Sequence, residues 1–310
     1  MAGFNEQITR ANVPIPETVA TEIIKEAPGQ SVMLTNAKRV PMSTKTMKQP
    51  VLSALPDAYW LNGDTALKQT THAEWSNLVM TAEELAVLVP VPNAVVDDSS
   101  IPIWSEVKPL LVEAIGKKVD MAAIWGDDKP ASWPTAIVPG ATAAGNTVTA
   151  GSDLTQDVAK LGGVLAADGF AANGFVTAPG FNWRLVGLRA SDGHPIYSPN
   201  VTAGQPSALY GLRLDEVRNG AWKTTTPATD LIGLDWSKFV VGVRQDITFD
   251  LFDQMVISDE AGKVIFNSAQ QDSKVMRVVF RVGFQVANPL TRVNPDGAKR
   301  YPAAVLVEGA

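Results

Sequence analysis

The amino-acid sequence predicts an α+β fold, and three features lead to this prediction. Apolar residues recur at helical spacing between about residues 102 and 125, which indicates one long amphipathic helix. Apolar and polar residues alternate over 239–251 and again over 277–286, which is typical of β-strands. Residues 31–81 are rich in Thr, Ser, Pro and Lys, so this segment is expected to form strands and loops that lie on a partner.

The composition is globular and excludes several kinds of chemistry. The 310 residues are ample for a large core, and 45% of them are hydrophobic whereas only 19% are charged, which suggests extensive buried contacts, including contacts between subunits. Because cysteine is absent, disulfides, thiolate nucleophiles and Cys-ligated zinc are excluded. The net charge of −6 disfavours binding to nucleic-acid phosphates through surface electrostatics.

Neither a secretion signal nor a membrane span is expected. Charged residues from Glu6 to Glu26 interrupt the first thirty residues, so these residues lack the apolar core of a signal peptide. The most apolar stretch, Leu85–Val96, contains two prolines and falls well short of the roughly 18 residues that a membrane helix requires. We therefore expect no membrane partner, and a protein that stays where it is made.

The N-terminal part predicts an arm, a short helix and an extended segment. Pro16–Ala27 carries a narrow apolar stripe and is stopped by Pro28-Gly29, so this helix must dock on another part of the structure. From Ser31 to Thr81 we expect extended strands and loops. Aromatic residues in this segment favour an ordered ribbon over a disordered insertion. These residues are Tyr59, Trp60 and Trp75.

A strand and the longest helix of the chain are predicted next. Val87–Val96 indicates a strand with prolines, and the polar run Asp97–Ser100 offers N-cap candidates for the helix that follows. That helix is expected from Pro102 to about Trp125. Pro109 either kinks it or marks where a short first turn gives way to the main helix.

The central and C-terminal parts predict mixed elements. Gly126–Gly151 is expected to be a loop between two subdomains, and Asp153 with Gln156 forms a capping-box pattern for a helix that ends near Ala167. Further expected elements are a strand ending at Val176, a helix over Pro179–Arg189, a turn at Asp192-Gly193, strands over Leu209–Val217, 239–251 and 277–286, and a turn at Asn294–Gly297.

Residues with catalytic or metal-binding chemistry are few. His72 and His194 are the only histidines and lie in segments of opposite character, so a histidine triad or a two-histidine metal site is disfavoured. Gly140–Gly145 has the glycine spacing of a phosphate loop but lacks the lysine that should follow. The acidic pairs Asp97-Asp98 and Asp127-Asp128 are more simply solvated caps than catalytic carboxylates. No catalytic residue, cofactor or metal site is therefore predicted.

Several short sequence segments, taken in order along the chain, resemble the tailed-bacteriophage major capsid family. They are IPETVATEII (Ile15–Ile24), AYWLNG (Ala58–Gly63), Thr81–Pro90, DMAAIWG (Asp120–Gly126), Gly174–Pro179, Leu209–Leu212, Val240–Ile247 and Arg277–Phe284, followed by Asn288-Pro289. Each segment alone is weak evidence for the family, but the ordered set covers nearly the whole chain. The resemblance implies the Hong Kong 97-type capsid fold, with an N-arm and short helix (1–36), an extended β-loop (37–80), a discontinuous peripheral domain with a long spine helix (81–128 and 236–310) and an axial domain (129–235).

The resemblance also implies how the protein works. In this family, subunits assemble into hexamers and pentamers of an icosahedral shell around double-stranded DNA, with a portal protein at one vertex and no cofactor. The protein would reside in the virion capsid after assembly in the bacterial host cytoplasm. Because the arm starts at Met1, a separate scaffold protein or none is expected, and decoration proteins are further candidate partners.

The extended loop is expected to supply the contacts between subunits. The residues concerned are Lys45, Lys48, Tyr59, Trp60, Lys68 and Trp75. Some relatives also join an extended-loop lysine covalently to an asparagine on a neighbour, here Asn288 or Asn294, but no motif identifies such a pair. Two other functions remain open: an encapsulin-like nanocompartment shell, which packs protein cargo, and a hydrolytic enzyme that uses the loop carboxylates Asp97 or Asp127.

Overall fold

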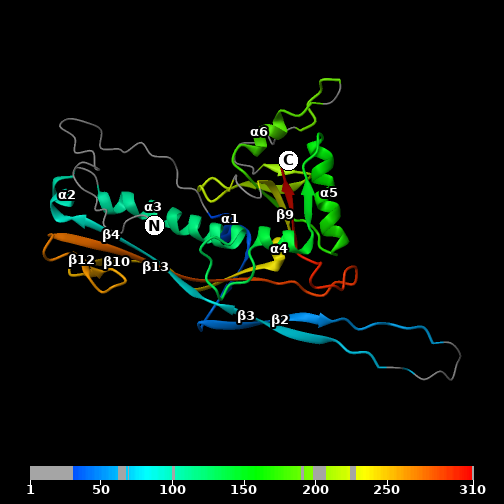
Figure 1. Ribbon diagram of the computed structural model, residues 1–310, viewed down its shortest axis with the longest axis horizontal. Helices are drawn as coiled ribbons and strands as arrows, with labels where there is room; N and C mark the ends of the chain where they lie inside the picture. Colours follow the sequence, from blue (N-terminus) through cyan, green and yellow to red (C-terminus); the bar gives the residue numbers. More distant parts are fainter. Residues whose placement is uncertain are drawn as a thin grey trace. The chain divides into compact units, whose positions relative to one another are not determined.

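The computed structural model describes residues 31–61, 68, 70–99, 102–189, 192–197, 207–223 and 228–308 (Figure 1). The predicted helix at Pro16–Ala27 lies outside these residues. The described chain divides into two compact units. The first comprises Glu83–Ile115 and Gln245–Val282, and the second comprises Gly29–Ala82, Gly116–Arg244 and Gly283–Ala310. No helix in the described ranges is both long enough and apolar enough to cross a membrane.

The first unit is built on an antiparallel strand pair. Strand β4 (Glu83–Pro92) pairs with β13 (Ser273–Val286) over ten residues, from Val282 opposite Glu83 to Ser273 opposite Pro92. Strands β11 (Val256–Ser258) and β12 (Val264–Asn267) form a separate hairpin. A small core joins β4 to the helices that follow it. It contains Val91, Val95 and Ile103, with Val89, Val96, Trp104 and Val107 packed against them.

One prediction at the end of β4 was wrong. Residues 93–98 form a short helix, α2 (Asn93–Asp98), and not the end of a strand followed by a cap. Burial of Val95 in the small core favours the helix over continued pairing with β13. Asp97 and Asp98 are therefore the last two residues of α2.

The long helix itself is confirmed. Helix α3 (Ile103–Asp120) contains Pro109 and passes into one π-helical segment, η1 (Met121–Trp125). Gly126, at a φ of 83°, ends it in the left-handed conformation that glycine tolerates best. The π segment leads directly from the buried Asp120 to four buried residues, so this end of the helix lies in the core of the second unit.

A six-stranded sheet forms the centre of the second unit. Its order is β5-β14-β9-β6-β8-β7. The strands are β5 (Thr147–Thr149), β14 (Ala303–Val307), β9 (Thr229–Leu234), β6 (Gly174–Thr177), β8 (Leu212–Glu216) and β7 (Ala208–Leu209).

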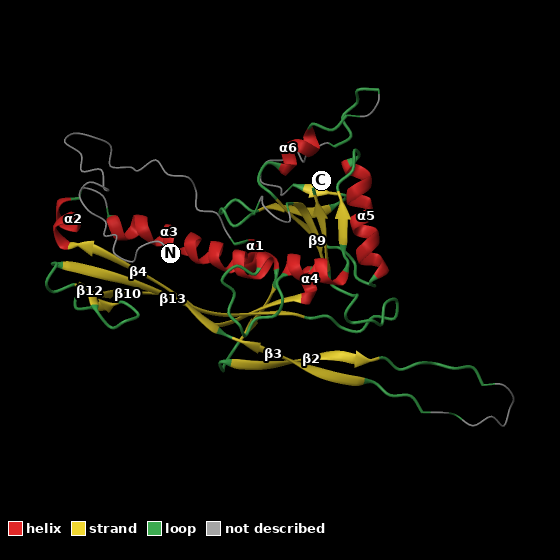
Figure 2. Ribbon diagram, viewed as in Figure 1, coloured by secondary structure: helices red, strands yellow, loops and turns green. Residues whose placement is uncertain are grey.

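Helix α5 covers this sheet (Figure 2). It spans Leu154–Ala167 and presents Val158, Leu161 and Leu165 to a core shared with strand residues of β6, β9 and β14. Asp153 caps it by accepting hydrogen bonds from the amides of Thr155 and Gln156, as the capping pattern predicted. The i, i+3 and i+7 spacing of its apolar residues explains why this helix could be predicted.

Three elements of this unit differ from expectation. The expected loop over Gly126–Gly151 contains helix α4 (Ile137–Ala144) and strand β5. Helix α6 (Phe181–Val186) is shorter than predicted, and the expected strand over Leu209–Val217 is the hairpin β7–β8. Helix α4 was missed because its small residues serve close packing: a Cβ on Gly140 would lie 2.5 Å from the ring of Tyr301.

The long C-terminal strands are confirmed, and both contribute to the two units. Strands β10 (Phe239–Phe252) and β13 belong to a sheet of order β1-β10-β13-β4. Strand β1 (Lys38–Pro41) runs parallel to β10, with Lys38 opposite Val240 and Pro41 opposite Val243. The short helix η2 (Trp236–Lys238) precedes β10. Strand β14, which was not predicted, ends the described chain in the six-stranded sheet.

Candidate assembly surfaces

The extended segment of the second unit forms a two-stranded ribbon. Strands β2 (Thr46–Ala54) and β3 (Glu74–Thr81) pair antiparallel from Thr46 opposite Thr81 to Ala54 opposite Glu74, with one irregularity beside Leu52 (Figure 1). The expected strands and loops are therefore confirmed here, although residues 32–36 form helix α1 (Val32–Asn36). A two-stranded ribbon is marginally stable in water, so its side chains must be supported from elsewhere.

The two faces of the ribbon have different surroundings. Residues directly opposite in an antiparallel pair share a face. One face, here called the outer face, carries exposed or half-buried side chains, among them Trp75 at 66% exposure and Val79 at 48%. The outer face consists of Lys48, Pro50, Leu52, Trp75, Asn77 and Val79. On the opposite, inner face, Met80 is buried and Met47, Val51 and Leu78 are half-buried.

Buried methionines and a closely packed glycine hold the end of the ribbon where β2 begins and β3 ends, here called its root. Met42, Met80, Ala82 and Val240 form a buried cluster, with Val40 and Met47 packed against it. A Cβ on Gly283 would lie 2.8 Å from the backbone oxygen of Thr81, so only glycine allows this approach. Gln285 also donates a hydrogen bond to the Val79 carbonyl at 2.9 Å.

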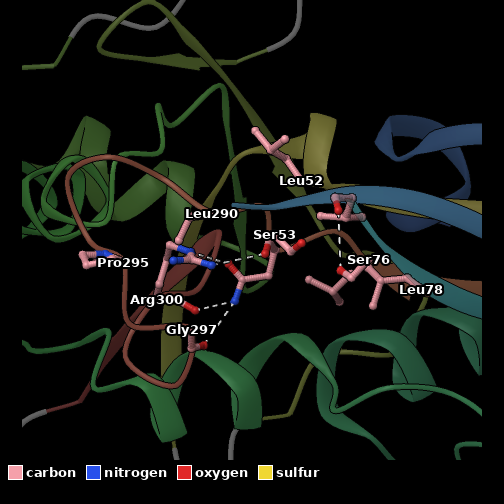
Figure 3. Close-up of a pocket in the computed structure, with 11 residues that line it drawn as sticks. Leu52, Ser53, Ser76, Leu78, Leu290, Pro295, Gly297 and Arg300 are labelled. Carbon is pink, nitrogen blue, oxygen red and sulfur yellow. Dashed lines mark hydrogen bonds between the residues drawn. The ribbon is translucent and has the colours of Figure 1, made fainter. Parts of the chain in front are cut away.

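The C-terminal segment 286–300 supports the inner face (Figure 3). The amide of Leu290 donates to the carbonyl of Leu52 at 3.1 Å. Between this segment and the ribbon lies an open hollow of about 280 Å³. It is lined by Val51, Leu52, Ser53, Ser76, Leu78, Val286, Asn288, Leu290, Pro295, Gly297 and Arg300.

A buried polar network fixes the shape of that segment. Arg300 is 4% exposed and donates to Asn288 Oδ1 at 3.0 Å and to the Asn294 carbonyl at 2.7 Å. Burial lowers the pKa of Arg300, while the charges of Asp168 and Asp296 oppose this shift. Asn294 in turn donates to Asp168 Oδ1 at 2.7 Å.

Both asparagines considered for covalent joining therefore have structural partners in the subunit. The Asn288 amide donates to the Arg300 carbonyl at 2.7 Å, and the Asn294 amide donates to Asp168 and to the Lys299 carbonyl. The same side chains hold the segment that supports the ribbon. These contacts give each asparagine a role in the fold.

The six residues expected at subunit contacts are all exposed but do not form one cluster. Lys48 and Trp75 lie on the outer face, whereas Lys45 lies in the turn before β2, where its carbonyl accepts a hydrogen bond from Ala82. The other three lie beyond the ends of the strands. They are Tyr59 at 43% exposure, Trp60 at 100%, and Lys68.

Beyond the strands, the C-terminal segment also contacts the ribbon's extension. Arg292 donates to Asp57 Oδ1 at 2.9 Å and to the Pro56 carbonyl at 2.5 Å. The Asp57 amide donates to Thr71 Oγ1 at 3.0 Å, which joins the two sides of the loop. Because the Arg292–Asp57 ion pair is exposed, its contribution to stability is small.

The residues with catalytic potential are dispersed. His72 lies 3.4 Å from Glu74 on the ribbon, and the His194 amide donates to Asp192 in the predicted turn. Asp127 pairs with Lys223 and Asp128 with Lys118. The Lys118 ammonium lowers the pKa of Asp128. Within the described residues, no three acidic, histidine or cysteine side chains are grouped to hold a metal ion.

Comparison with known proteins agrees with this architecture. Residues 11–291 match the model of the phage capsid family. The chain is 26% identical to the major capsid protein of Staphylococcus phage 80alpha over 276 residues, covering 86% of this chain and 80% of that protein.

Solved structures are similar over almost the whole length. A structure from Microbacterium phage Oxtober96 has a TM-score of 0.82 at 33% identity, covering 98% of this chain and all of the other. One from Mycobacterium phage Bobi has a TM-score of 0.81 at 31% identity, with the same coverage. The fold is thus that of the Hong Kong 97-type capsid proteins.

The chain belongs to the phage capsid family. It is a structural protein of the virion capsid and not an enzyme, and the comparisons do not favour the nanocompartment alternative.

Proposed function

We propose that this chain is the subunit that forms the hexamers and pentamers of an icosahedral shell enclosing double-stranded DNA. The ribbon β2–β3 carries this proposal, because its outer face presents Trp75 and Val79 to solvent in the single chain. An exposed tryptophan is the kind of side chain that anchors protein interfaces. The outer face is therefore expected to be covered by a second copy.

Charge supports a second copy as the partner. The segments Glu83–Ile115 and Gln245–Val282 contain 12 acidic and 5 basic residues, a net charge of −7, whereas the whole chain carries −6. The ribbon and its loop, residues 44–81, carry no such excess, because Lys45, Lys48 and Lys68 balance Asp57, Asp64 and Glu74. Attraction between these lysines and the acidic segments of a neighbour would orient the subunits before contact.

Different parts of the chain form different parts of the capsid subunit. Residues 1–36 are the arm, 37–80 the extended loop, 81–128 with 236–310 the peripheral domain, and 129–235 the axial domain. Lys45, Lys48, Tyr59, Trp60, Lys68 and Trp75 supply contacts between copies. A portal protein, a separate scaffold or decoration proteins complete the particle, which assembles in the bacterial cytoplasm.

The direct test is assembly of the purified protein. Sedimentation and negative-stain electron microscopy should reveal shells, sheets or rings of subunits. Deleting residues 44–70 should leave a folded, soluble subunit that cannot close shells, because the six-stranded core does not include this segment. Normal shells from the deletion would disprove the role of the ribbon.

A further inference from the structure

A buried carboxylate lies where the described chain begins. Asp120, the last residue of α3, is fully buried. Its Oδ1 accepts hydrogen bonds from the Ser31 hydroxyl at 2.7 Å and the Met33 amide at 3.0 Å. Its Oδ2 accepts from the Val32 amide at 3.1 Å and from Asn219 Nδ2 at 2.7 Å. Neutral donors thus fill four acceptor positions of the carboxylate.

Two neighbouring features shape this site to receive Ser31. Gly116 precedes Asp120 by four residues, so both lie on the same side of α3. A Cβ on Gly116 would lie 3.2 Å from the Ser31 Cβ, so glycine permits the close approach. Asn219 holds the carboxylate from the other side while its own oxygen accepts from the Ala221 amide at 3.1 Å. One of the four hydrogen bonds to the carboxylate therefore comes from outside residues 31–33.

Residues 31–33 fit the site through polar and apolar contacts together. The Ser31 hydroxyl donates to Asp120 and accepts from the Leu34 amide, so it also caps helix α1. Met33 is fully buried and Val32 is 6% exposed. A five-residue helix has little stability of its own, so these contacts must hold it in place.

We propose that Gly116, Asp120 and Asn219 form a seat that fixes the root of the N-terminal arm, and that this fixed root is required for shell closure. The second part rests on the proposed assembly function. Ser31 is where the first thirty residues of the arm join the described chain, so its position fixes the point at which they are attached. Asp120 acts as a positioning residue, because its carboxylate is buried within the subunit and accepts hydrogen bonds from the subunit's own side chains and backbone.

Ser31→Ala tests the seat, and Asp153→Ala is its matched control. Ser31→Ala removes the N-cap hydroxyl of α1, and Asp153→Ala removes the N-cap carboxylate of α5, which also belongs to the second unit. Only Ser31 contacts Asp120. Hydrogen exchange should accelerate about tenfold at Val32 and Met33 in Ser31→Ala alone. Shells of Ser31→Ala should fail to close, while Asp153→Ala, destabilised to a similar extent, should assemble normally.

Three outcomes would count against parts of this inference. Unchanged exchange at Val32 and Met33 in Ser31→Ala would overturn the seat. Faster exchange with normal shells, or equal assembly defects in Ser31→Ala and Asp153→Ala, would overturn its role in closure. If the wild-type chain itself formed no shells, the assembly function would fail in this assay, and the exchange data would still decide whether the seat exists.

Discussion

Trp75 allows the assembly surface to be tested with a worked magnitude. Its side chain is 66% exposed on the outer face of the ribbon, opposite Leu52. A tryptophan buries about 200 Å² when fully covered, so roughly 130 Å² remains for a neighbour to cover. At about 25 cal/mol per Å², covering this area contributes about 3 kcal/mol. Trp75→Ala should therefore raise the protein concentration needed for assembly by roughly 150-fold.

The same substitution should hardly affect the isolated subunit. Exposed substitutions change the free energy of unfolding by less than about 0.5 kcal/mol, which urea denaturation of unassembled subunits would measure. Ser76→Ala is the matched control, because Ser76 is adjacent but belongs to the inner face. Assembly of Trp75→Ala at wild-type concentrations would refute the outer face as a contact surface. So would a defect of equal size in Ser76→Ala.

Other predictions concern the ribbon root, acid stability and charge. Gly283→Ala should destabilise the subunit by about 1–3 kcal/mol, because the added Cβ meets the backbone of Thr81. Gly242→Ala should destabilise it less, because the nearest atoms to its Cβ belong to flexible methionine side chains. The urea midpoints of the two variants would show which substitution is more destabilising. Hydrogen bonding to Lys160 lowers the pKa of Asp157, so the ionised carboxylate stabilises the folded state above about pH 4. This stabilisation is lost as the pH falls through the lowered pKa. Asp157→Asn should therefore flatten the acid side of the stability profile measured by thermal unfolding. Lys48→Glu should slow assembly most at low salt, and rates that do not depend on ionic strength would contradict steering by charge.

Elements with local signals could be predicted from the sequence. The long helix and α5 repeat apolar residues at helical spacing, and Asp153 caps α5 with contacts two and three residues away. The alternating segments 239–251 and 277–286 lie within strands β10 and β13, which span fourteen residues each. In each case the information lies within the element, so local patterns were sufficient.

Elements supported by distant residues could not be predicted. Helix α1 spans only five residues and is held by Asp120, which is 89 positions from Ser31. The network under the ribbon joins Asp168 to Asn294 across 126 positions. In the sequence, Asp120 is one acidic residue near the end of a helix, and nothing local indicates that it accepts four hydrogen bonds.

The ribbon shows how one segment can be held and still remain available for binding. Its inner face is supported by the segment 286–300 and by the methionine cluster, which fixes the strands within the second unit. Its outer face has no equivalent support within the described residues of that unit, as the 66% exposure of Trp75 shows. A ribbon already ordered in the free subunit loses little further entropy when a neighbour covers it. Support on one face therefore strengthens association through the other, and loosening the root at Gly283 should weaken assembly without changing any residue of the outer face.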